Sequence, residues 1–291
     1  MHSGKPVRLT ILPAQANEGI RFRRCDIALG DTIIPARYDL VKATQLCTRI
    51  VNGAGADVST IEHVMAALAG CGVHNALIEI DGPEVPILDG SSAPFVRGIL
   101  GKGLRQLKAP LHAIELLDTV RVQTDAGWAQ LSPARGSTMR FHIDFPDEAI
   151  GRQTRQLNLA NGTFVRELCD SRTFCRRAEV DAMQAMGLAL GGIAGKNAVV
   201  FNGADVEGTD LRHADEPVRH KMLDALGDLA LAGAPIIGHY EGHKAGHALT
   251  NKLLRALFTL NGAYRKVTCD AQTAARLPGT GVQREEIPAV A

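Results

Sequence analysis

Three polar side chains recur at four-residue intervals in the segment EPVRHKMLDALGDL, residues 216–229. They are His220, Asp224 and Asp228. On an α-helix, residues four apart point the same way, with Cβ atoms about 5–6 Å apart. His220 and Asp224 can therefore offer one nitrogen and one oxygen to a single ion, and a third ligand with water would complete a catalytic zinc site. The alternative is an exposed pair that contributes roughly a few tenths of a kcal/mol.

A second pair of candidates, Glu62 and His63, lies in STIEHVMAALAG, residues 59–70. His63 can supply the third metal ligand. Glu62 can act as a general base, because zinc lowers the pKa of a water that it binds to about 7. Ser59 and Glu62 also have the spacing of a capping box, so capping of the helix is the alternative role for Glu62. The two roles do not exclude each other.

His247 begins another helical pattern, HALTNKLLRALFTL, residues 247–260. A carboxylate such as Asp228 close to it would favour the imidazolium form, and His247 would then be a general acid. His239 and His243 repeat the spacing of four and offer a rival metal site. Glycines interrupt that run, which argues against one helix that carries all three histidines.

Lys221 follows His220 directly in the sequence. An ammonium group beside a metal site can stabilise an oxyanion or bind an anionic substrate. On most helices such a lysine is simply solvated, and the spacing leaves both interpretations open.

The segments that carry these residues occur in a similar order in the two halves of the chain. Each half has a histidine-bearing helix that ends in LAG, then a strand, then a second helix: 59–70, 75–81 and 95–100, and again 216–231, 235–240 and 247–260. This repeat predicts an α+β fold of two similar two-layer α/β sandwich domains with the active site at their interface. We expect domains over 1–107 and 113–280, joined by a linker within 101–113.

The composition limits the class of protein. The chain has 291 residues and a formal net charge of +1, so nothing favours nucleic acid as a partner. Its six cysteines form no CxxC pair, and no apolar run reaches the ~18–20 residues of a membrane span. The start MHSGKPVRLT lacks the order of a signal peptide. We therefore expect a cytoplasmic protein without a membrane span.

Five motifs together resemble one known family. They are STIEHVMAALAGCGVHNALIEIDGPEVPILDGSSAPF, SRTF, LALGG, DEPVRHKMLDALGDLALAG and KAGHALTNKLL. In this order, over essentially the whole chain, they closely resemble the UDP-3-O-acyl-N-acetylglucosamine deacetylases, the LpxC family. The resemblance implies a zinc-dependent amide hydrolase that removes acetate from the glucosamine nitrogen of an acylated UDP-sugar, the committed step of lipid A biosynthesis.

The resemblance also implies roles for individual residues. The zinc ligands would be His63, His220 and Asp224. The catalytic groups would be Glu62 as general base, His247 as general acid supported by Asp228, and Thr173 with Lys221 at the oxyanion. Phe174 would lie against the substrate, and the positions matched to the UDP moiety are Asp144, Phe145 and Lys244.

The family's two domains each carry an insert, and the second insert forms an apolar passage for the acyl chain. That insert would fall near residues 174–200, with Val180, Ala189 and Ile193 as candidates for its wall. By itself the segment VDAMQAMGLALGG, residues 180–192, is more typical of a helix core; the resemblance favours the passage.

Some expectations concern the start of the chain and its partners. Family members usually carry a strand before a GLHSG-like motif, whereas this chain begins MHSG, so we expect the first strand of domain one to be absent. Either the start is truncated or the edge of that sheet is built differently, and an unpaired edge would lower stability. We also expect a monomer that contacts the membrane surface transiently. The rival functions are a zinc amidohydrolase acting on another acylated amine, a nucleic-acid-binding module and an inactive scaffold.

Overall fold

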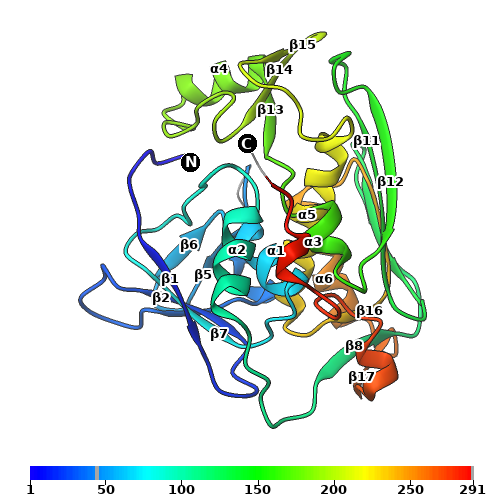
Figure 1. Cartoon of the computed structure of the whole chain (residues 1–291). Helices are drawn as coiled ribbons and strands as arrows, with labels where there is room; N and C mark the ends of the chain where they lie inside the picture. Colours follow the sequence, from blue (N-terminus) through cyan, green and yellow to red (C-terminus); the bar gives the residue numbers. More distant parts are fainter. Residues whose placement is uncertain (43–45, 290–291) are drawn as a thin grey trace.

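The structure, a computed structural model, describes residues 1–42 and 46–289. It is a mixed α/β fold in which the two larger sheets lie on the outside and most of the helices of both halves lie between them (Figure 1). The predicted α+β class is confirmed. Among the described residues, no helix is long and apolar enough to cross a membrane.

The first half contains a four-stranded sheet and a smaller three-stranded one. Its elements are β1 (Leu9–Pro13), β2 (Ile20–Arg24), β3 (Ile33–Pro35), β4 (Val41–Lys42), β5 (Arg49–Val51), β6 (Asp57–Ser59), α1 (Glu62–Gly70), β7 (Ala76–Ile80) and α2 (Ala93–Lys102). The larger sheet has the order β1-β7-β2-β3, and the smaller one the order β4-β5-β6.

The second half has a seven-stranded sheet and an inserted one. Its elements outside the insert are β8 (His112–Leu116), β9 (Val120–Gln123), β10 (Trp128–Ser132), β11 (Ser137–Asp144), β12 (Arg152–Asn158), α3 (Thr163–Glu167), α5 (Glu216–Leu229), β16 (Ile236–His243), α6 (His247–Thr259), β17 (Tyr264–Thr268) and α7 (Ala271–Ala274). The insert consists of β13 (Phe174–Arg176), α4 (Arg177–Ala185), β14 (Val199–Asn202) and β15 (Asp205–Glu207). The sheet has the order β12-β11-β16-β10-β9, with β8 beside β16 and β17 beside β8.

The two large sheets share one pattern of strand pairing. Strand β7 pairs antiparallel with β1 and parallel with β2, which pairs antiparallel with β3. Strand β16 pairs antiparallel with β10 and parallel with β11, which pairs antiparallel with β12. In each case a histidine-bearing helix, α1 or α5, comes before the strand that pairs in both directions. The repeat read from the sequence is therefore present in the topology.

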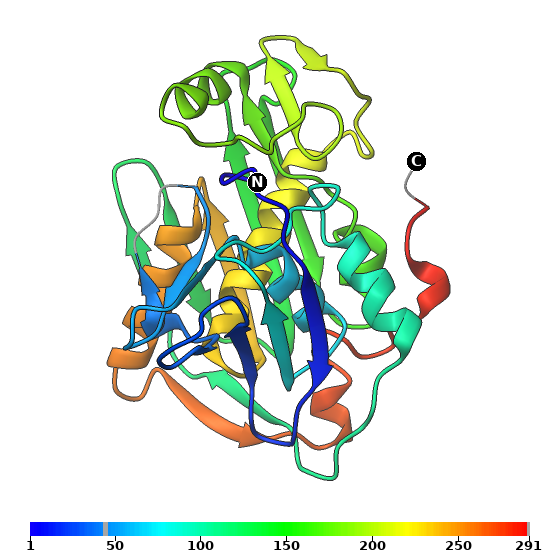
Figure 2. The same cartoon turned by 90° about the vertical axis from the view of Figure 1, so that its left-hand side faces the viewer.

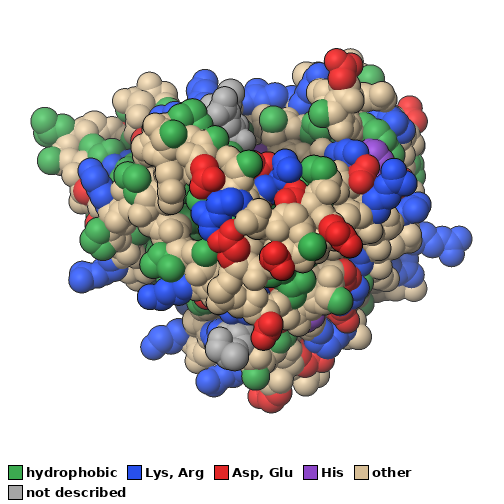
Figure 3. Space-filling model, turned by 90° about the horizontal axis from the view of Figure 1, so that it is seen from above, with side chains coloured by type: hydrophobic (Ala, Val, Ile, Leu, Met, Phe, Trp, Pro, Cys, Tyr) green, Lys and Arg blue, Asp and Glu red, His purple; other side chains and the backbone are tan. Residues whose placement is uncertain are grey.

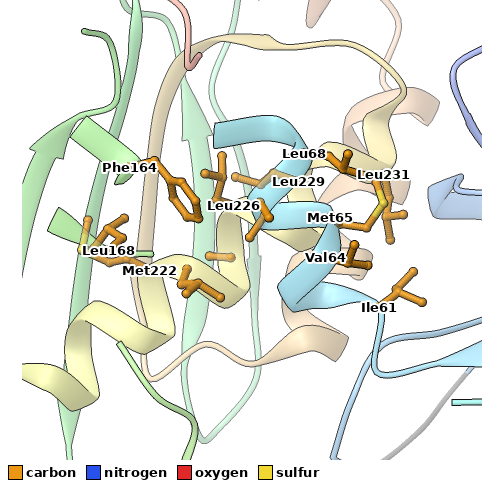
Figure 4. Packing of buried hydrophobic residues seen from close by; sticks show 14 of the residues in the cluster. Ile61, Val64, Met65, Leu68, Phe164, Leu168, Met222, Leu226, Leu229 and Leu231 are labelled. Atoms are coloured by element: carbon orange, nitrogen blue, oxygen red, sulfur yellow. The ribbon is translucent and has the colours of Figure 1, made fainter. Parts of the chain in front are cut away.

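The helices between the sheets pack against one another through one continuous apolar cluster that draws on both halves. Figure 4 shows side chains of α1 and α5 meeting in this layer, with Phe164 and Leu168 beside them. The close approach of the two helices requires a glycine. A Cβ on Gly227 of α5 would lie 2.0 Å from the carbonyl oxygen of Glu62. Since this is far inside van der Waals contact, Gly227 allows α1 to begin directly against α5.

The insert with α4 lies beside the N-terminal segment in both views (Figures 1 and 2). Backbone N–H groups of Leu190 and Gly191 donate to the carbonyl oxygens of His2 and Met1. Residues far apart in the sequence therefore meet at the top of the molecule. Seen from above, basic and acidic side chains are interspersed on this face, without a concentrated basic stripe (Figure 3).

The secondary structure corrects the predicted role of Ser59. Ser59 belongs to β6, and α1 begins at Glu62 without a side-chain cap. The capping box predicted between Ser59 and Glu62 is therefore wrong. The run from His239 to His243 lies in β16 rather than on a helix, as the glycines indicated.

Candidate metal centre and acid–base site

His63, His220 and Asp224 meet where the start of α1 packs against α5. All three side chains are at most 7% exposed, so the alternative of an exposed His–Asp pair is wrong. Nε2 of His220 lies 3.3 Å from Oδ1 of Asp224, and Nε2 of His63 lies 3.6 Å from the same oxygen. One donor atom from each residue lies within 4.8 Å of the other two. This spacing is suitable for three ligands of one ion.

The chemistry of these donors fits zinc. Oδ1 of Asp224 is buried and has no hydrogen-bond partner among the residues that the structure describes. A buried carboxylate oxygen without a donor is costly, and native proteins rarely leave one unsatisfied. Two imidazole nitrogens with one carboxylate oxygen form a ligand set common in catalytic zinc sites. A divalent cation between the three residues would satisfy that oxygen.

Neighbouring groups orient two of these side chains. Nδ1 of His220 donates to the carbonyl oxygen of Ser171 at 3.0 Å, which leaves Nε2 free as a ligand atom. Nζ of Lys221 donates to Oδ2 of Asp224 at 2.8 Å. Burial opposes ionisation of Asp224, but the charges of His220 and Lys221 hold its pKa well below the ordinary value. The solvated alternative for Lys221 is wrong, because its ammonium group binds this buried carboxylate.

Glu62 is buried beside the three ligands. Oε2 accepts a hydrogen bond from the backbone N–H of Thr48 at 3.0 Å. Burial raises the pKa of Glu62 to about 7. The positive charge of His247 opposes this rise, and the negative charges of Asp224 and Asp228 add to it. A carboxyl group whose pKa lies near neutrality can accept a proton and release it again.

His247 is the first residue of α6 and points its second nitrogen at the same site. Nδ1 pairs with Oδ2 of Asp228 at 2.8 Å, and Nε2 lies 3.9 Å from Oε1 of Glu62. Burial lowers the pKa of His247, but the carboxylates of Asp228 and Glu62 outweigh it and raise the pKa to about 9. These carboxylates favour the protonated form of His247, which is the form that a general acid needs.

Thr173 and Phe174 lie at the junction between the site and the insert. The backbone N–H of Thr173 donates to the carbonyl oxygen of Gly90 at 2.7 Å. The ring of Phe174 lies 6.3 Å from that of His220 and 5.5 Å from that of Phe145, in both cases edge to face. Phe174 and Phe145, both predicted to contact substrate, therefore lie together beside His220.

Asp144 and Lys244 form an ion pair at the end of β11 and just after β16. Nζ of Lys244 lies 2.8 Å from Oδ2 of Asp144. The hydrogen bond from Lys244 lowers the pKa of Asp144. Asp144 precedes Phe145 in the chain, so the three residues matched to the UDP moiety lie near one another.

The three residues predicted for the passage wall are not all in one place. Val180 and Ala189 belong to a small buried cluster within the insert, together with Met183 and Val200. The side chain of Ile193 is 51% exposed and lies outside that cluster.

Sequence reasoning missed Thr48, which contacts the site, and Glu216, which lies one helical turn before His220. Thr48 donates its hydroxyl to Oδ1 of Asp228 at 2.5 Å, and nothing in its local sequence signals this contact. Glu216 lies four residues before His220 and is buried. The same four-residue spacing that led to Asp224 and Asp228 would have found Glu216 if it had been extended one turn towards the N-terminus.

Comparisons with known proteins show one family to which nearly the whole chain is similar. A family model described as UDP-3-O-acyl N-acetylglycosamine deacetylase, LpxC, matches residues 1–259. A UDP-3-O-acyl-N-acetylglucosamine deacetylase of Shewanella frigidimarina is 42% identical over 94% of this chain and 89% of its own length. Proteins of the same description from Pasteurella multocida and Phenylobacterium zucineum are 42% and 46% identical, over 94% and 91% of this chain and 90% of their own lengths.

Proposed function

The chain belongs to the UDP-3-O-acyl N-acetylglycosamine deacetylase family, and from that premise we propose that His63, His220 and Asp224 hold its catalytic zinc ion. It is an enzyme of lipid A biosynthesis, a hydrolase that releases acetate from UDP-3-O-[(3R)-3-hydroxyacyl]-N-acetylglucosamine and leaves the free amine. The observation that carries the zinc assignment is Oδ1 of Asp224, which lies between two imidazole nitrogens and has no hydrogen-bond partner in the described part of the chain. A zinc ion held there would polarise the acetamide carbonyl and supply a nucleophile at neutral pH.

Glu62 is the general base of the proposed mechanism. Thr48 holds Oε2, and Oε1 faces His247 across the site. Oε1 can therefore accept the proton of the attacking water. The raised pKa of Glu62 makes its carboxylate a base of suitable strength for this step.

His247 is the proposed general acid. When the tetrahedral intermediate collapses, Nε2 of His247 donates its proton to the leaving glucosamine nitrogen. Asp228 holds Nδ1 of the same ring and favours the imidazolium before that transfer. Thr173 is assigned to the developing oxyanion, with Lys221 supplying positive charge behind Asp224.

The remaining assignments concern substrate and context. Phe174 would contact the substrate, and Asp144, Phe145 and Lys244 its UDP moiety. The acyl chain would enter the insert, where Val180, Ala189 and Ile193 remain proposed wall residues. We assign the domains to 1–107 and 113–280, and the enzyme to the cytoplasm as a monomer. It would touch the membrane surface only to exchange its acylated substrate, and would not bind nucleic acid.

The direct test combines metal analysis with an acetate-release assay on the acylated UDP-sugar. We expect one equivalent of zinc per chain and stoichiometric release of acetate and amine. Metal analysis also distinguishes zinc from iron. A folded protein that binds neither metal and releases no acetate would overturn the proposal. An acylated amine without the UDP group tests the rival amidohydrolase, which predicts equal turnover of both compounds.

A further inference from the structure

Glu216 is the most buried carboxylate near the site, with 1% of its surface exposed. Its two oxygens accept four hydrogen bonds. Oε1 accepts from N and Nε of Arg172, both at 2.9 Å. Oε2 accepts from Nη2 of Arg172 at 3.1 Å and from the backbone N–H of Arg212 at 2.8 Å. These donors satisfy both carboxylate oxygens, so Glu216 is available for neither a metal nor a substrate. We call Glu216, Arg172 and Arg212 the Glu216 network.

The network fixes the residues on both sides of Ser171. Arg172 follows Ser171 and is held by Glu216 through its main chain and its side chain. Asp170 precedes Ser171, and its carbonyl oxygen accepts from Nη1 of Arg212 at 2.7 Å. The carbonyl oxygen of Ser171, between these two residues, accepts a hydrogen bond from Nδ1 of His220. The direction in which Nε2 of His220 points therefore depends on a carbonyl group that the network holds from both sides.

The same network reaches the first half of the chain. Nη2 of Arg212 donates to Oδ2 of Asp89 at 3.1 Å, and Oδ1 of Asp89 accepts from N and Oγ of Ser91. The next residue, Ser92, donates its hydroxyl to the carbonyl oxygen of His63 at 2.8 Å. One turn thus connects the main chain of His63 to the network that orients His220.

Stability is a weak explanation for these bonds. Replacement of a buried ion pair by apolar residues is often neutral or stabilising, so burial alone does not show that such a pair stabilises the fold. Ion pairs of this kind can instead specify one arrangement of the chain. Here the bonds converge on the main chain next to two of the three proposed ligands, which favours a role in their geometry.

We propose that Glu216 is a positioning residue: through Arg172 and Arg212 it sets the orientation of the His220 imidazole and its position relative to His63. This inference rests on the proposed metal site. Glu216 contacts neither the ion nor the substrate, and it acts through the carbonyl of Ser171 and the turn at 89–92.

The test measures Zn²⁺ affinity of metal-free protein by competition with a chromophoric chelator. For Glu216→Gln and Arg172→Lys we expect Zn²⁺ to bind ~10–100-fold more weakly than in the wild type. Arg172→Lys keeps the positive charge but loses the planar guanidinium group that binds Glu216. If the role of Arg172 were only electrostatic, this variant would keep its Zn²⁺ affinity. Arg212→Met removes the bonds to Asp89 and Asp170 and keeps the backbone N–H to Glu216, and we expect a smaller loss.

Arg24→Met is the matched control. Arg24 is also buried and pairs with Asp26 and Asp57, but it contacts no residue of the Glu216 network. This variant should lower the thermal midpoint and leave Zn²⁺ affinity unchanged. The visible absorption of Co²⁺-loaded protein supplies a second readout, because its bands report ligand geometry. We expect altered bands in Glu216→Gln and unchanged bands in Arg24→Met.

Two failures can be told apart. If wild-type protein binds one equivalent of Zn²⁺ and Glu216→Gln binds it within twofold of the wild type, the positioning role is overturned and the proposed function stands. If wild-type protein binds no metal, the proposed function itself fails. If Glu216→Gln does not fold, Arg172→Lys and Arg212→Met decide, and wild-type affinity with unchanged Co²⁺ bands in both overturns the inference.

Discussion

Oε1 of Glu62 and Nε2 of His247 lie 3.9 Å apart, with the proposed ligand Asp224 beside them. Thr48 contacts Glu62 directly and is connected to His247 through Asp228. Its N–H donates to Glu62, and its hydroxyl donates to Asp228, the partner of His247. One residue therefore supports the proposed base directly and the proposed acid through one carboxylate, so the two can act on opposite ends of the same amide bond.

Replacement of Glu62 tests the base. In Glu62→Gln the side chain keeps its shape and cannot accept the proton, so we expect kcat to fall ~10²–10⁴-fold. Zinc content should stay at one equivalent, because Glu62 is not a ligand. Steady-state kinetics with metal analysis on the same sample measures both. Wild-type turnover in this variant would exclude Glu62 as the base.

Asp228→Asn tests the support of the acid. Asp228 raises the pKa of His247, so its neutralisation lowers that pKa. A general acid acts while protonated, and activity is lost as pH rises through its pKa. The high-pH limb of kcat/KM should therefore move to lower pH in Asp228→Asn. In His247→Ala the acid is absent at every pH, so most activity should be lost on the plateau below that limb as well. A limb that stays in place in both variants would contradict the assignment.

Thr48→Val removes the hydroxyl and retains the shape and the backbone N–H. Oδ1 of Asp228 then lacks its donor, which costs about 1–3 kcal/mol of folding free energy. We also expect kcat to fall, because Asp228 no longer holds His247 in one orientation. The control is Thr250→Val, an equally buried threonine whose hydroxyl contacts Tyr240. The control should lose stability in urea denaturation and keep its kcat; an equal loss of kcat in both variants would refute the special role of Thr48.

Gly227→Ala tests the close approach of α5 to α1. The added Cβ would lie 2.0 Å from the carbonyl oxygen of Glu62, so the helices must separate. We expect a loss of about 3 kcal/mol or more in urea denaturation, with weaker metal binding. Gly98→Ala in α2 is the control, because its Cβ would meet no atom of the described residues within 4 Å. There the better helix propensity of alanine should stabilise by about 0.5–1 kcal/mol. A small loss of stability in Gly227→Ala would show that α1 and α5 can separate at little energetic cost.

Glu84 gives a prediction for acid stability. Burial alone would raise its pKa, but hydrogen bonds from Ser3 and His2 outweigh it and lower the pKa to about 2. A carboxylate with a depressed folded pKa contributes stability that is fully present above its unfolded value, 4.5, and is lost as pH falls towards 2. Glu84→Gln should lose stability at pH 7 and show a flatter profile between pH 4.5 and 2. Chemical denaturation at several pH values measures this, and parallel profiles would contradict it.

The spacing of residues within one helix was informative because it depends only on local geometry. His220, Asp224 and Asp228 do lie on α5, and α6 begins at His247 as predicted. The spacing does not show whether these side chains are buried. The same spacing fits a solvated pair, and only the packing of α1 on α5 decides against it.

The capping box failed for a related reason. Ser59 and Glu62 have the spacing of a capping box. However, Ser59 belongs to β6, and Glu62 accepts a hydrogen bond from the backbone N–H of Thr48 rather than from that of Ser59. Tertiary contacts with another segment outweighed the local signal. Thr48 and the pairing of Arg172 with Glu216 could not be predicted, because the partners of both residues are distant in sequence; Thr48 lies in no motif, and the SRTF motif does not reveal what Arg172 binds.

The repeated strand pairing means that the proposed metal site belongs to neither half. His63 comes from one copy, whereas His220 and Asp224 come from the other, and the position that corresponds to Asp224 in α1 is Ala67. The two copies have therefore become unequal partners, and a cation bound by all three residues would be a cross-link between them. Neither half alone supplies all three residues, so activity would require both halves to be folded and packed together.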